Sequence, residues 1–336
     1  MIKTLYSLLL CMLLVACNQS TKPATAISFY HWKSVFNLTP QEKECLKFNE
    51  SKTLYLKYFD VVKEEGLVKP VSVIQFQQQP SLNIIPVVFI KNNVFVGTDK
   101  NQTDTLVNHV SKLVQQINVK HHISIQHIQF DCDWTETTQE LYFYFLKQFA
   151  KANPQTTLSA TIRLHQIKYK LKTGIPPVTS GVLMCYNMGK IAGDTLNSIY
   201  DRQLANKYLS HLKTYSLPLK IALPIFTWGI QSRHGKVLNL LNKMSAHHFL
   251  NDSNFTKQTN TTFKVKNYCF KGGYYFSKDD IVKIESVSSQ QLVEITDDIT
   301  QYFDNKLNEV IFYDLDTINL NQYDKGIFKK IASAIN

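Results

Sequence analysis

The sequence predicts a (β/α)8 TIM barrel, in which eight parallel strands alternate with helices, as its fold class. Eight short apolar runs, rich in β-branched and aromatic residues, follow one another along the chain. Longer stretches with a helical period separate these runs, and strands separated by helices pair in parallel. No G-x-G-x-x-G follows the first run and eight strands close a barrel, so the barrel is favoured over a doubly wound sheet.

The strands are predicted within residues 26–32, 53–61, 83–90, 127–134, 157–166, 181–189, 219–228 and 308–316. The clearest helices are predicted at 103–117 and 138–153, where apolar residues recur at steps of three and four. The segment from His247 to Lys283 is polar and has no long periodic helix. We therefore expect an insertion after strand seven, and such loops often shape a ligand site.

The first residues predict export rather than folded structure. Met1 and Lys3 precede an apolar run that is too short to cross a bilayer and is typical of a signal peptide. The run ends in "LVAC", which resembles the bacterial lipobox, so we expect cleavage before Cys17 and lipidation of its thiol. The alternative is an ordinary secretory signal with an incidental cysteine.

Three segments follow from this interpretation: a lipoprotein signal peptide at 1–16, a tether at 17–25 and one TIM-barrel domain at 26–336. Asn18 is not the aspartate that resembles an inner-membrane retention signal. The expected protein is therefore a monomer of the cell envelope, lipid-anchored to the outer membrane through Cys17.

The net charge bears on the class of partner, and the cysteine positions bear on disulfides and zinc sites. The formal net charge is +11, but the lysines are scattered and form no dense basic run. The sequence therefore predicts no nucleic-acid partner, and anionic glycans or lipid headgroups fit the charge better. Cys45, Cys132, Cys185 and Cys269 lie far apart without a C-x-x-C, so neither a disulfide nor a zinc site is predicted.

Strand four ends in "FDCDW", which carries two carboxylates. Side chains alternate along a strand, so Gln129, Asp131 and Asp133 are expected to face the barrel interior. Two carboxylates at this spacing should raise the pKa of at least one of them, which suits acid–base chemistry. The alternative is that they neutralise a cation inside the barrel, and Arg163 on the next strand is a ready partner.

Strands five and six add polar residues at the same end of the barrel, where TIM barrels carry their active sites. Thr161, Arg163 and His165 share a face of strand five, so Arg163 and His165 are expected to converge with Asp133. Tyr186 lies at the end of strand six.

Metal binding is the weakest interpretation of these residues. Asp131, Asp133 and His165 offer oxygen and nitrogen ligands, but no tight ligand spacing such as H-x-x-x-H occurs. We predict no metal and no cofactor.

Two of the strand ends resemble a known family. "FDCDW" and "MCYN" are similar to the D-x-D-x-E and M-x-Y-D/N strand signatures of glycoside hydrolase family 18, the chitinase-like (β/α)8 barrels. The resemblance implies that Asp133 supports a glutamate that protonates the glycosidic oxygen, and that Tyr186 holds the substrate's N-acetyl group. Asp131 is the motif's first aspartate. The glutamate position falls on Thr135, and Glu136 stands one residue later.

The whole mature chain also resembles a group of lipoproteins from Bacteroidetes-type bacteria. The segments "FYHWKSVF", "LYLKYFDV", "FDCDWT" and "SATIRLHQ" carry this resemblance. It implies a lipid anchor but no particular activity.

Aromatic and basic residues at other strand ends suit a sugar ligand. Aromatic rings stack on the C–H face of a pyranose, and basic side chains meet carboxylates or sulfates. The aromatic candidates are Tyr30, Trp32, Tyr58, Trp228 and Tyr313. The basic candidates are Lys57, Arg163, Arg233 and His234. The complete predicted substrate-binding set is Tyr30, Trp32, Lys57, Arg163, His165, Asn187, Trp228, Arg233 and Asp314.

The function predicted from these patterns is that of a lipid-anchored, glycan-active TIM-barrel protein that acts as a glycoside hydrolase on a poly- or oligosaccharide. Its predicted catalytic residues are Asp131, Asp133, Glu136 and Tyr186, and Asp314 is a further candidate for an acid–base pair. One alternative is a non-catalytic glycan-binding protein that has lost the acid. Another is a structural envelope lipoprotein that binds protein.

Overall fold

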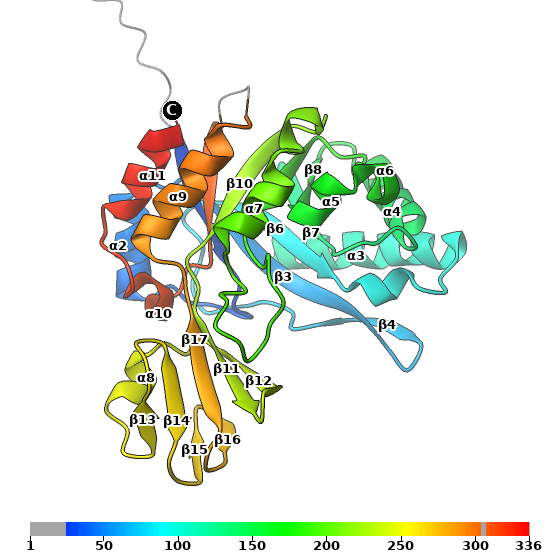
Figure 1. Cartoon of the computed structure of the whole chain (residues 1–336). Helices are drawn as coiled ribbons and strands as arrows, with labels where there is room; N and C mark the ends of the chain where they lie inside the picture. Colours follow the sequence, from blue (N-terminus) through cyan, green and yellow to red (C-terminus); the bar gives the residue numbers. More distant parts are fainter. Residues whose placement is uncertain (1–24, 304–306, 336) are drawn as a thin grey trace, which may run out of the picture.

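Eight parallel strands close into a barrel in the computed structural model of the chain, which describes residues 25–303 and 307–335 (Figure 1). β1 pairs with β18 on one side and with β3 on the other, which closes the ring. In pairing order the barrel strands are β1 (Ala26–His31), β3 (Thr53–Glu64), β6 (Asn83–Ile90), β7 (His127–Asp131), β8 (Thr157–Arg163), β9 (Ser180–Met184), β10 (Leu219–Pro224) and β18 (Glu309–Tyr313). Each of the eight predicted runs overlaps one of them, so the predicted fold class is confirmed.

The predicted signal peptide, the lipidation site Cys17 and nearly all of the tether lie outside the described residues. Within the described ranges, no helix is both long enough and apolar enough to cross a bilayer.

Helices cover the outside of the barrel (Figure 1). They are α2 (Pro40–Phe48), α3 (Lys100–Lys120), α4 (Gln139–Ala152), α5 (Leu164–Lys168), α6 (Lys170–Thr173), α7 (Arg202–Leu209), α9 (Ser289–Thr300), α10 (Thr317–Leu320) and α11 (Ile327–Ile335), with short 3-10 helices η1 (Asn92–Phe95) and η2 (Leu212–Thr214). α3 and α4 are the two helices predicted most clearly. A capping box starts α3, because the Asp99 carboxylate accepts from the Gln102 backbone N–H while the Gln102 side chain accepts from that of Asp99.

One crossover differs from the regular barrel pattern. Residues 65–82, between β3 and β6, hold β4 (Leu67–Val71) and β5 (Gln75–Phe76) in place of a helix. β4 folds back antiparallel on β3, and β5 pairs with β2 (Val35–Phe36). The Gly66 backbone, at φ 80°, makes the turn into β4.

The main apolar core lies between the strands and the helices. Phe130 of β7 is fully buried and packs edge to face on Phe145 and Phe149 of α4, at centroid distances of 5.1 and 4.8 Å. The alternate side chains of the same strand face the barrel axis, as predicted. Gln129 accepts a hydrogen bond from the Tyr30 hydroxyl at 2.6 Å across the interior.

Polar side chains seal the amino-terminal half of the barrel interior. The Glu309 carboxylate lies 2.5 Å from the Lys220 ammonium and accepts hydrogen bonds from Ser28 and Tyr55. These polar groups satisfy one another at this end, and TIM barrels carry their sites at the opposite end, where the strands finish.

A second, antiparallel sheet is inserted between β10 and α9, as expected after strand seven (Figure 1). This insertion, residues 228–285, consists of β11 (Trp228–Arg233), β12 (Lys236–Asn242), α8 (His247–Leu250), β13 (Phe255–Lys257), β14 (Thr262–Val265), β15 (Cys269–Lys271), β16 (Tyr274–Phe276) and β17 (Ile281–Glu285). The predicted boundary at His247 was too late. β10 ends at Pro224 and Trp228 opens β11, a break that the continuous apolar run 219–228 concealed.

The insertion has a small core of its own, and Glu285 fastens it to the barrel. Phe263 is fully buried there and packs on the ring of Phe249. The Glu285 carboxylate, at the end of β17, accepts from the Trp228 indole N–H at 2.8 Å and from the Ser198 hydroxyl at 2.5 Å. Ser198 belongs to the β9–α7 loop, which runs beside the insertion (Figure 1).

The separate core predicts local unfolding of the insertion. Phe263→Ala should cost about 3–5 kcal/mol of packing and cavity energy within it. Hydrogen exchange followed by mass spectrometry should then show protection lost within 228–285 and retained in β6–β8. Phe130→Ala, in the barrel core, is the control and should lower protection in the barrel as well. Equal loss throughout the chain for Phe263→Ala would contradict an independent core.

Candidate functional site

The Arg163 guanidinium lies between the two aspartates of strand four. Its Nη2 is 3.4 Å from Asp131 Oδ1, and its Nε donates a short hydrogen bond to Asp133 Oδ1. Its Nη1 lies 2.8 Å from the Met184 sulfur. The predicted convergence of Arg163 with the aspartates is therefore observed. It takes the form of the predicted alternative, in which the carboxylates neutralise a cation.

Asp131 is the buried member of the pair. The Thr161 hydroxyl donates to Asp131 Oδ1 at 2.6 Å, and only 3% of the residue is exposed. Burial raises the pKa of Asp131. The Asp133 charge adds to the rise, while Arg163 and the Thr161 hydrogen bond offset part of it. Asp133 lies above, exposed to solvent, so the two carboxylates occupy different depths of the same site.

The chain turns away from the barrel directly after Asp133. Trp134 is fully buried, and its indole N–H donates to the Thr173 carbonyl at 2.7 Å. Thr135 then begins a helical turn, because the Gln139 N–H donates to its carbonyl at 2.9 Å. Thr135 and Glu136 are both exposed on this turn. Strand alternation stops at Asp131, and Glu136 has no hydrogen-bond or ion-pair partner in the described structure. The expected catalytic placement of Glu136 does not occur.

Tyr186 forms the floor beside Arg163. Its hydroxyl lies 3.1 Å from the Met184 sulfur, and its ring stacks on Tyr313 at 5.3 Å with 23° between the planes. Burial raises the pKa of Tyr186, so its hydroxyl stays protonated as a donor. Tyr186 and Asp131 thus lie together on one polar patch, as predicted.

Aromatic rings that follow two further strands, β1 and β10, pack against Tyr313. The Trp32 ring lies 5.4 Å from Tyr313 and the Phe226 ring lies 5.7 Å from it. Phe226 in turn contacts Trp228 at 5.1 Å. Trp32 and Tyr313 are half-buried residues, whereas Tyr186, Phe226 and Trp228 are buried. We call Trp32, Tyr186, Phe226, Trp228 and Tyr313 the aromatic wall.

Lys57 lies at the rim of the aromatic wall. Its ammonium is 5.6 Å from the centre of the Trp32 ring and 3.1 Å from Asp60 Oδ2. Asp60 was not among the predicted residues. It lies three positions after Lys57 on a strand with a bulge between Lys57 and Phe59, which breaks the simple alternation.

Two predicted aromatic contacts are wrong. Tyr30 is fully buried beneath the site, where its hydroxyl bonds Gln129, so it supports the floor and offers no free ring face. Tyr58 points out of the barrel and donates to Asn118 Oδ1 of α3 at 2.8 Å. Strand period alone does not report how deep a residue lies.

The structure also separates other predicted residues from the centre. β8 ends at Arg163 and α5 begins at Leu164, so His165 does not share a strand face with Arg163. Its imidazole is exposed, and partial burial and the Arg163 charge lower its pKa although Asp133 opposes them. Asn187 is exposed in a left-handed conformation at φ 56°. In the described part of the chain neither residue forms a hydrogen bond or ion pair with the aspartates, although His165 lies close enough to Asp133 and Arg163 for both charges to act on it.

Arg233 and His234 belong to the insertion and not to the barrel mouth. The Arg233 guanidinium binds Asp280 through Nε at 2.6 Å and Ser277 through Nη2 at 2.6 Å. His234 stands in the β11–β12 turn at φ 49°. Trp228 is the only predicted insertion residue that touches the aromatic wall among those described.

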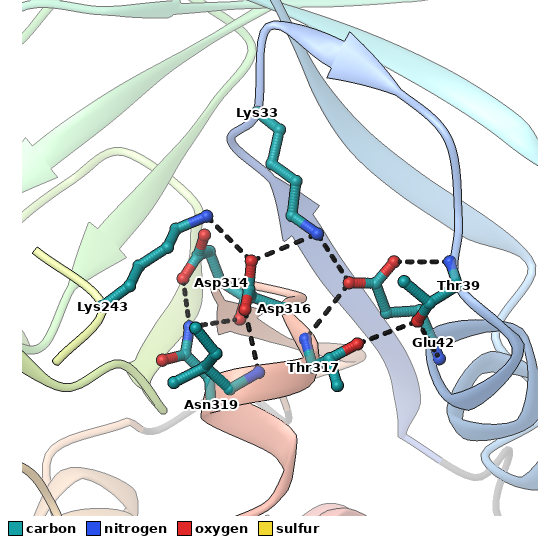
Figure 2. Close-up of polar contacts among 9 residues, drawn as sticks. Lys33, Thr39, Glu42, Lys243, Asp314, Asp316, Thr317 and Asn319 are labelled. Carbon is teal, nitrogen blue, oxygen red and sulfur yellow. Dashed lines mark hydrogen bonds and ion pairs between the residues drawn. The ribbon is translucent and has the colours of Figure 1, made fainter. Parts of the chain in front are cut away.

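A second polar cluster lies beside the mouth, after β1 and β18 (Figure 2). Asp314 is buried, and the Asn319 amide donates to its Oδ1 at 2.5 Å. Burial raises the pKa of Asp314 to about 6, and the Asp316 charge adds to this while Lys243 and Lys33 oppose it. Asp314 is therefore held by the protein rather than directed at Asp131.

Lys33 and Lys243 bridge the same cluster (Figure 2). Lys33 binds Glu42 at 2.7 Å and Asp316 at 3.1 Å, and Lys243 of the insertion binds Asp316 at 2.8 Å. The cluster joins α2, the β18 loop and the insertion. Lys33 lies two residues after the end of β1 and Asp316 three residues after the end of β18, so the strand-end rule could have found both. Nothing in the sequence around Lys243 indicated its role.

His31 is enclosed by this cluster. It is fully buried, and neither ring nitrogen has a hydrogen-bond partner in the described part of the chain. Burial, with the Lys33 and Lys243 charges, lowers its pKa to about 3, so its imidazole is neutral at ordinary pH. Among residues 25–303 and 307–335, no group of three His, Cys, Asp or Glu side chains is arranged to hold a metal ion.

Solved structures with the same barrel cover nearly the whole chain. The spore cortex-lytic enzyme SleL of Bacillus megaterium matches 94% of this chain and 75% of its own, at 14% identity and a TM-score of 0.54. SleL of Bacillus cereus gives the same coverage and identity with a TM-score of 0.53. A GH18 chitinase of Cycas revoluta, solved with (GlcNAc)4, matches 92% of this chain and 98% of its own, at 12% identity and a TM-score of 0.52.

These neighbours are chitinase-like (β/α)8 barrels, and the chain shares that fold. At such identities the likeness concerns the fold alone. No protein-family model and no curated protein sequence matches the chain.

The two ion pairs of Arg163 predict that truncating its side chain will cause a large loss of stability. Arg163→Met should lower the free energy of unfolding by about 3–5 kcal/mol, because it leaves Asp131 buried without its cation. Urea unfolding at pH 7 measures this, and adding Asp131→Asn should restore part of the loss. Lys329→Met breaks an exposed pair with Glu50 and should change stability little. Equal effects of the two single variants would contradict the special role of Arg163.

The raised pKa of Asp314 predicts that the stability of the protein falls as the pH rises. Its folded-state pKa lies above the usual 3.8, so the folded state binds the proton more tightly and loses stability between pH 4 and 6. A rise to about 6 corresponds to a cost on the order of 3 kcal/mol once the group is ionised. Asp314→Asn should therefore be more stable than the parent at pH 8 and similar to it at pH 4, in urea unfolding.

The matched control is Asp316→Asn. The hydrogen bond from Lys243 and the charges of Lys243 and Lys33 hold the pKa of Asp316 below its usual value, although burial opposes them. Asp316→Asn should destabilise the protein at pH 8 and have a smaller effect at low pH. Its effect on stability should therefore change with pH in the opposite direction to that of Asp314→Asn. Parallel pH profiles for the two variants would refute the assignment.

Proposed function

We propose that the barrel mouth binds a glycan, and that it does so without the family-18 catalytic acid. The observation that carries the proposal is the pairing of Arg163 with both aspartates beside the aromatic wall. The acid position of the motif is Thr135, on an exposed turn, and Glu136 points to solvent. A site with bound carboxylates and half-exposed rings recognises a sugar more readily than it protonates one.

Each part of the mouth has a role in this proposal. The half-buried Trp32 and Tyr313 stack on pyranose rings. Asp133 is exposed, and its carboxylate accepts hydrogen bonds from sugar hydroxyls. The Lys57 ammonium, beside the Trp32 ring, donates to them. The (GlcNAc)4 complex of the Cycas revoluta chitinase supports an N-acetylated oligosaccharide as the first ligand to test.

Hydrolysis is the second candidate. Two carboxyl groups with raised pKa values, Asp131 and Asp314, favour it, because a general acid must remain protonated near neutral pH. For Asp131 to act, a bound substrate would have to displace Arg163 from it. The binding proposal needs no such rearrangement.

We also propose where in the cell the protein is located. We infer lipidation at Cys17 and attachment at the outer membrane from the "LVAC" segment. β1 begins at Ala26, at the amino-terminal end of the barrel, so a tether from Cys17 would leave the mouth directed away from the membrane. Mass spectrometry of the membrane fraction for a lipidated amino-terminal peptide tests this inference.

Trp32→Ala should weaken glycan binding. Loss of one stacking ring should raise the Kd for a responsive N-acetylated oligosaccharide several-fold, up to about tenfold. Isothermal titration calorimetry against a panel of neutral, N-acetylated and acidic oligosaccharides measures this. Phe48→Ala is the control, because Phe48 is an exposed aromatic residue at the end of α2, beside Lys329 and far from the strand ends.

Mass spectrometry of the same incubations decides between binding and hydrolysis. Binding without shorter products supports the proposal. Shorter products from the parent that disappear with Asp131→Asn would replace it with hydrolysis. No binding of any oligosaccharide, or equal affinities of the parent and Trp32→Ala, would refute the mouth as a glycan site.

A further inference from the structure

The β15–β16 hairpin of the insertion has aromatic side chains on both faces. Its inner face packs on the insertion core, and Phe276 there is fully buried. Phe270 pairs with Tyr275 across the hairpin, so both lie on the other face. Tyr268 directly precedes β15 and, like Tyr275, lies close enough to Arg233 to act on its charge. The Phe270 and Tyr275 rings are 5.0 Å apart.

This outer face is open to solvent. Tyr268 is 67% exposed, Phe270 79% and Tyr275 44%. The solvent face of an antiparallel hairpin is ordinarily polar, and an apolar cluster there marks an interaction site. We call Tyr268, Phe270 and Tyr275 the hairpin patch.

Three cations lie near the hairpin patch in space or in sequence, and Arg233, the first of them, is paired with Asp280. Arg233 lies close enough for the Tyr275 and Tyr268 hydroxyls to act on its charge. Lys266 and Lys278 flank the hairpin in sequence, are exposed and have no ion-pair partner within the described residues. The insertion carries nine Lys and Arg against four Asp and Glu. A ligand that matches the patch must therefore combine flat apolar faces with negative charge.

We propose that the hairpin patch binds an anionic polysaccharide, one bearing carboxylate or sulfate groups, as an accessory site distinct from the barrel mouth. The C–H faces of its sugars stack on the three rings, and Lys266, Lys278 and Arg233 meet its charges. As an extension of glycan recognition at the mouth, this inference rests on the proposed function.

The strand β11 connects the two sites. Trp228, at its start, belongs to the aromatic wall, and Arg233, at its end, lies beside the hairpin patch. Five residue steps of extended chain span roughly 17 Å. A single polysaccharide chain can therefore lie along the insertion with one part at each site. A membrane fits less well, because β1 begins at the other end of the barrel.

Affinity electrophoresis of the full chain in gels containing polygalacturonate or dextran sulfate tests the proposal. The test variant carries Tyr268→Ser, Phe270→Ser and Tyr275→Ser, all exposed changes that spare the core. Its apparent affinity should fall at least tenfold. Lys266→Gln with Lys278→Gln should also weaken binding and lessen its salt dependence. The control carries Leu67→Ser, Val119→Ser and Leu171→Ser, which are equally exposed elsewhere, and should bind like the parent.

Two further measurements separate the outcomes. Calorimetry with the short neutral oligosaccharide bound at the mouth should be unchanged in the triple serine variant. If the mouth binds nothing while the polyanion still binds through the patch, the proposed function fails and the accessory site stands. Retardation that is equal in the triple variant and the parent overturns the accessory site. The accessory site is also overturned if no polysaccharide binds while the parent sediments with phosphatidylglycerol vesicles and the triple variant does not.

Discussion

The Arg163 guanidinium, held between Asp131 and Asp133, is the interaction on which the upper part of the barrel depends. A buried carboxylate is tolerated only where a cation and hydrogen bonds compensate its lost hydration. Arg163 and the Thr161 hydroxyl provide both for Asp131, and the same guanidinium touches the Met184 sulfur that Tyr186 also contacts. Strands β7, β8 and β9 are thereby joined at their carboxyl ends, and the stacked Tyr186 and Tyr313 rings carry the connection to β18.

That arrangement limits what the mouth can do chemically. The motif resembles family 18 in its two aspartates and its tyrosine, yet the acid position leads into the exposed turn at Thr135. The buried Trp134 anchors this turn, since its indole and its carbonyl are both held by the β8–β9 segment. Restoring a glutamate at position 135 alone would therefore place it on an exposed helical turn. In the function we propose, the aromatic wall positions a sugar while Arg163 occupies the two aspartates.

The insertion changes how the barrel meets its surroundings. Glu285 and Lys243 tie it to the barrel from two sides, through the β9–α7 loop and through Asp316. Each tie includes a carboxylate of low exposure, Glu285 or Asp316, so the insertion is positioned by electrostatics as well as by packing. An aromatic hairpin on such a support extends the surface that begins at Trp228.

The eight strands, the helices α3 and α4 and the inward direction of Asp131 could all be predicted from the sequence, because strand and helix periods are local properties of the chain. The pairing of Arg163 with the aspartates followed from their positions at neighbouring strand ends. The sequence could not show that His165 lies in a helix, that Tyr58 faces α3, or that Tyr30 lies beneath the site, because depth and element ends depend on neighbouring strands. Only the tertiary structure brought Lys243 to Asp316 and exposed Tyr268, Phe270 and Tyr275 together, since those contacts join segments whose order in the chain says nothing of their distance in space.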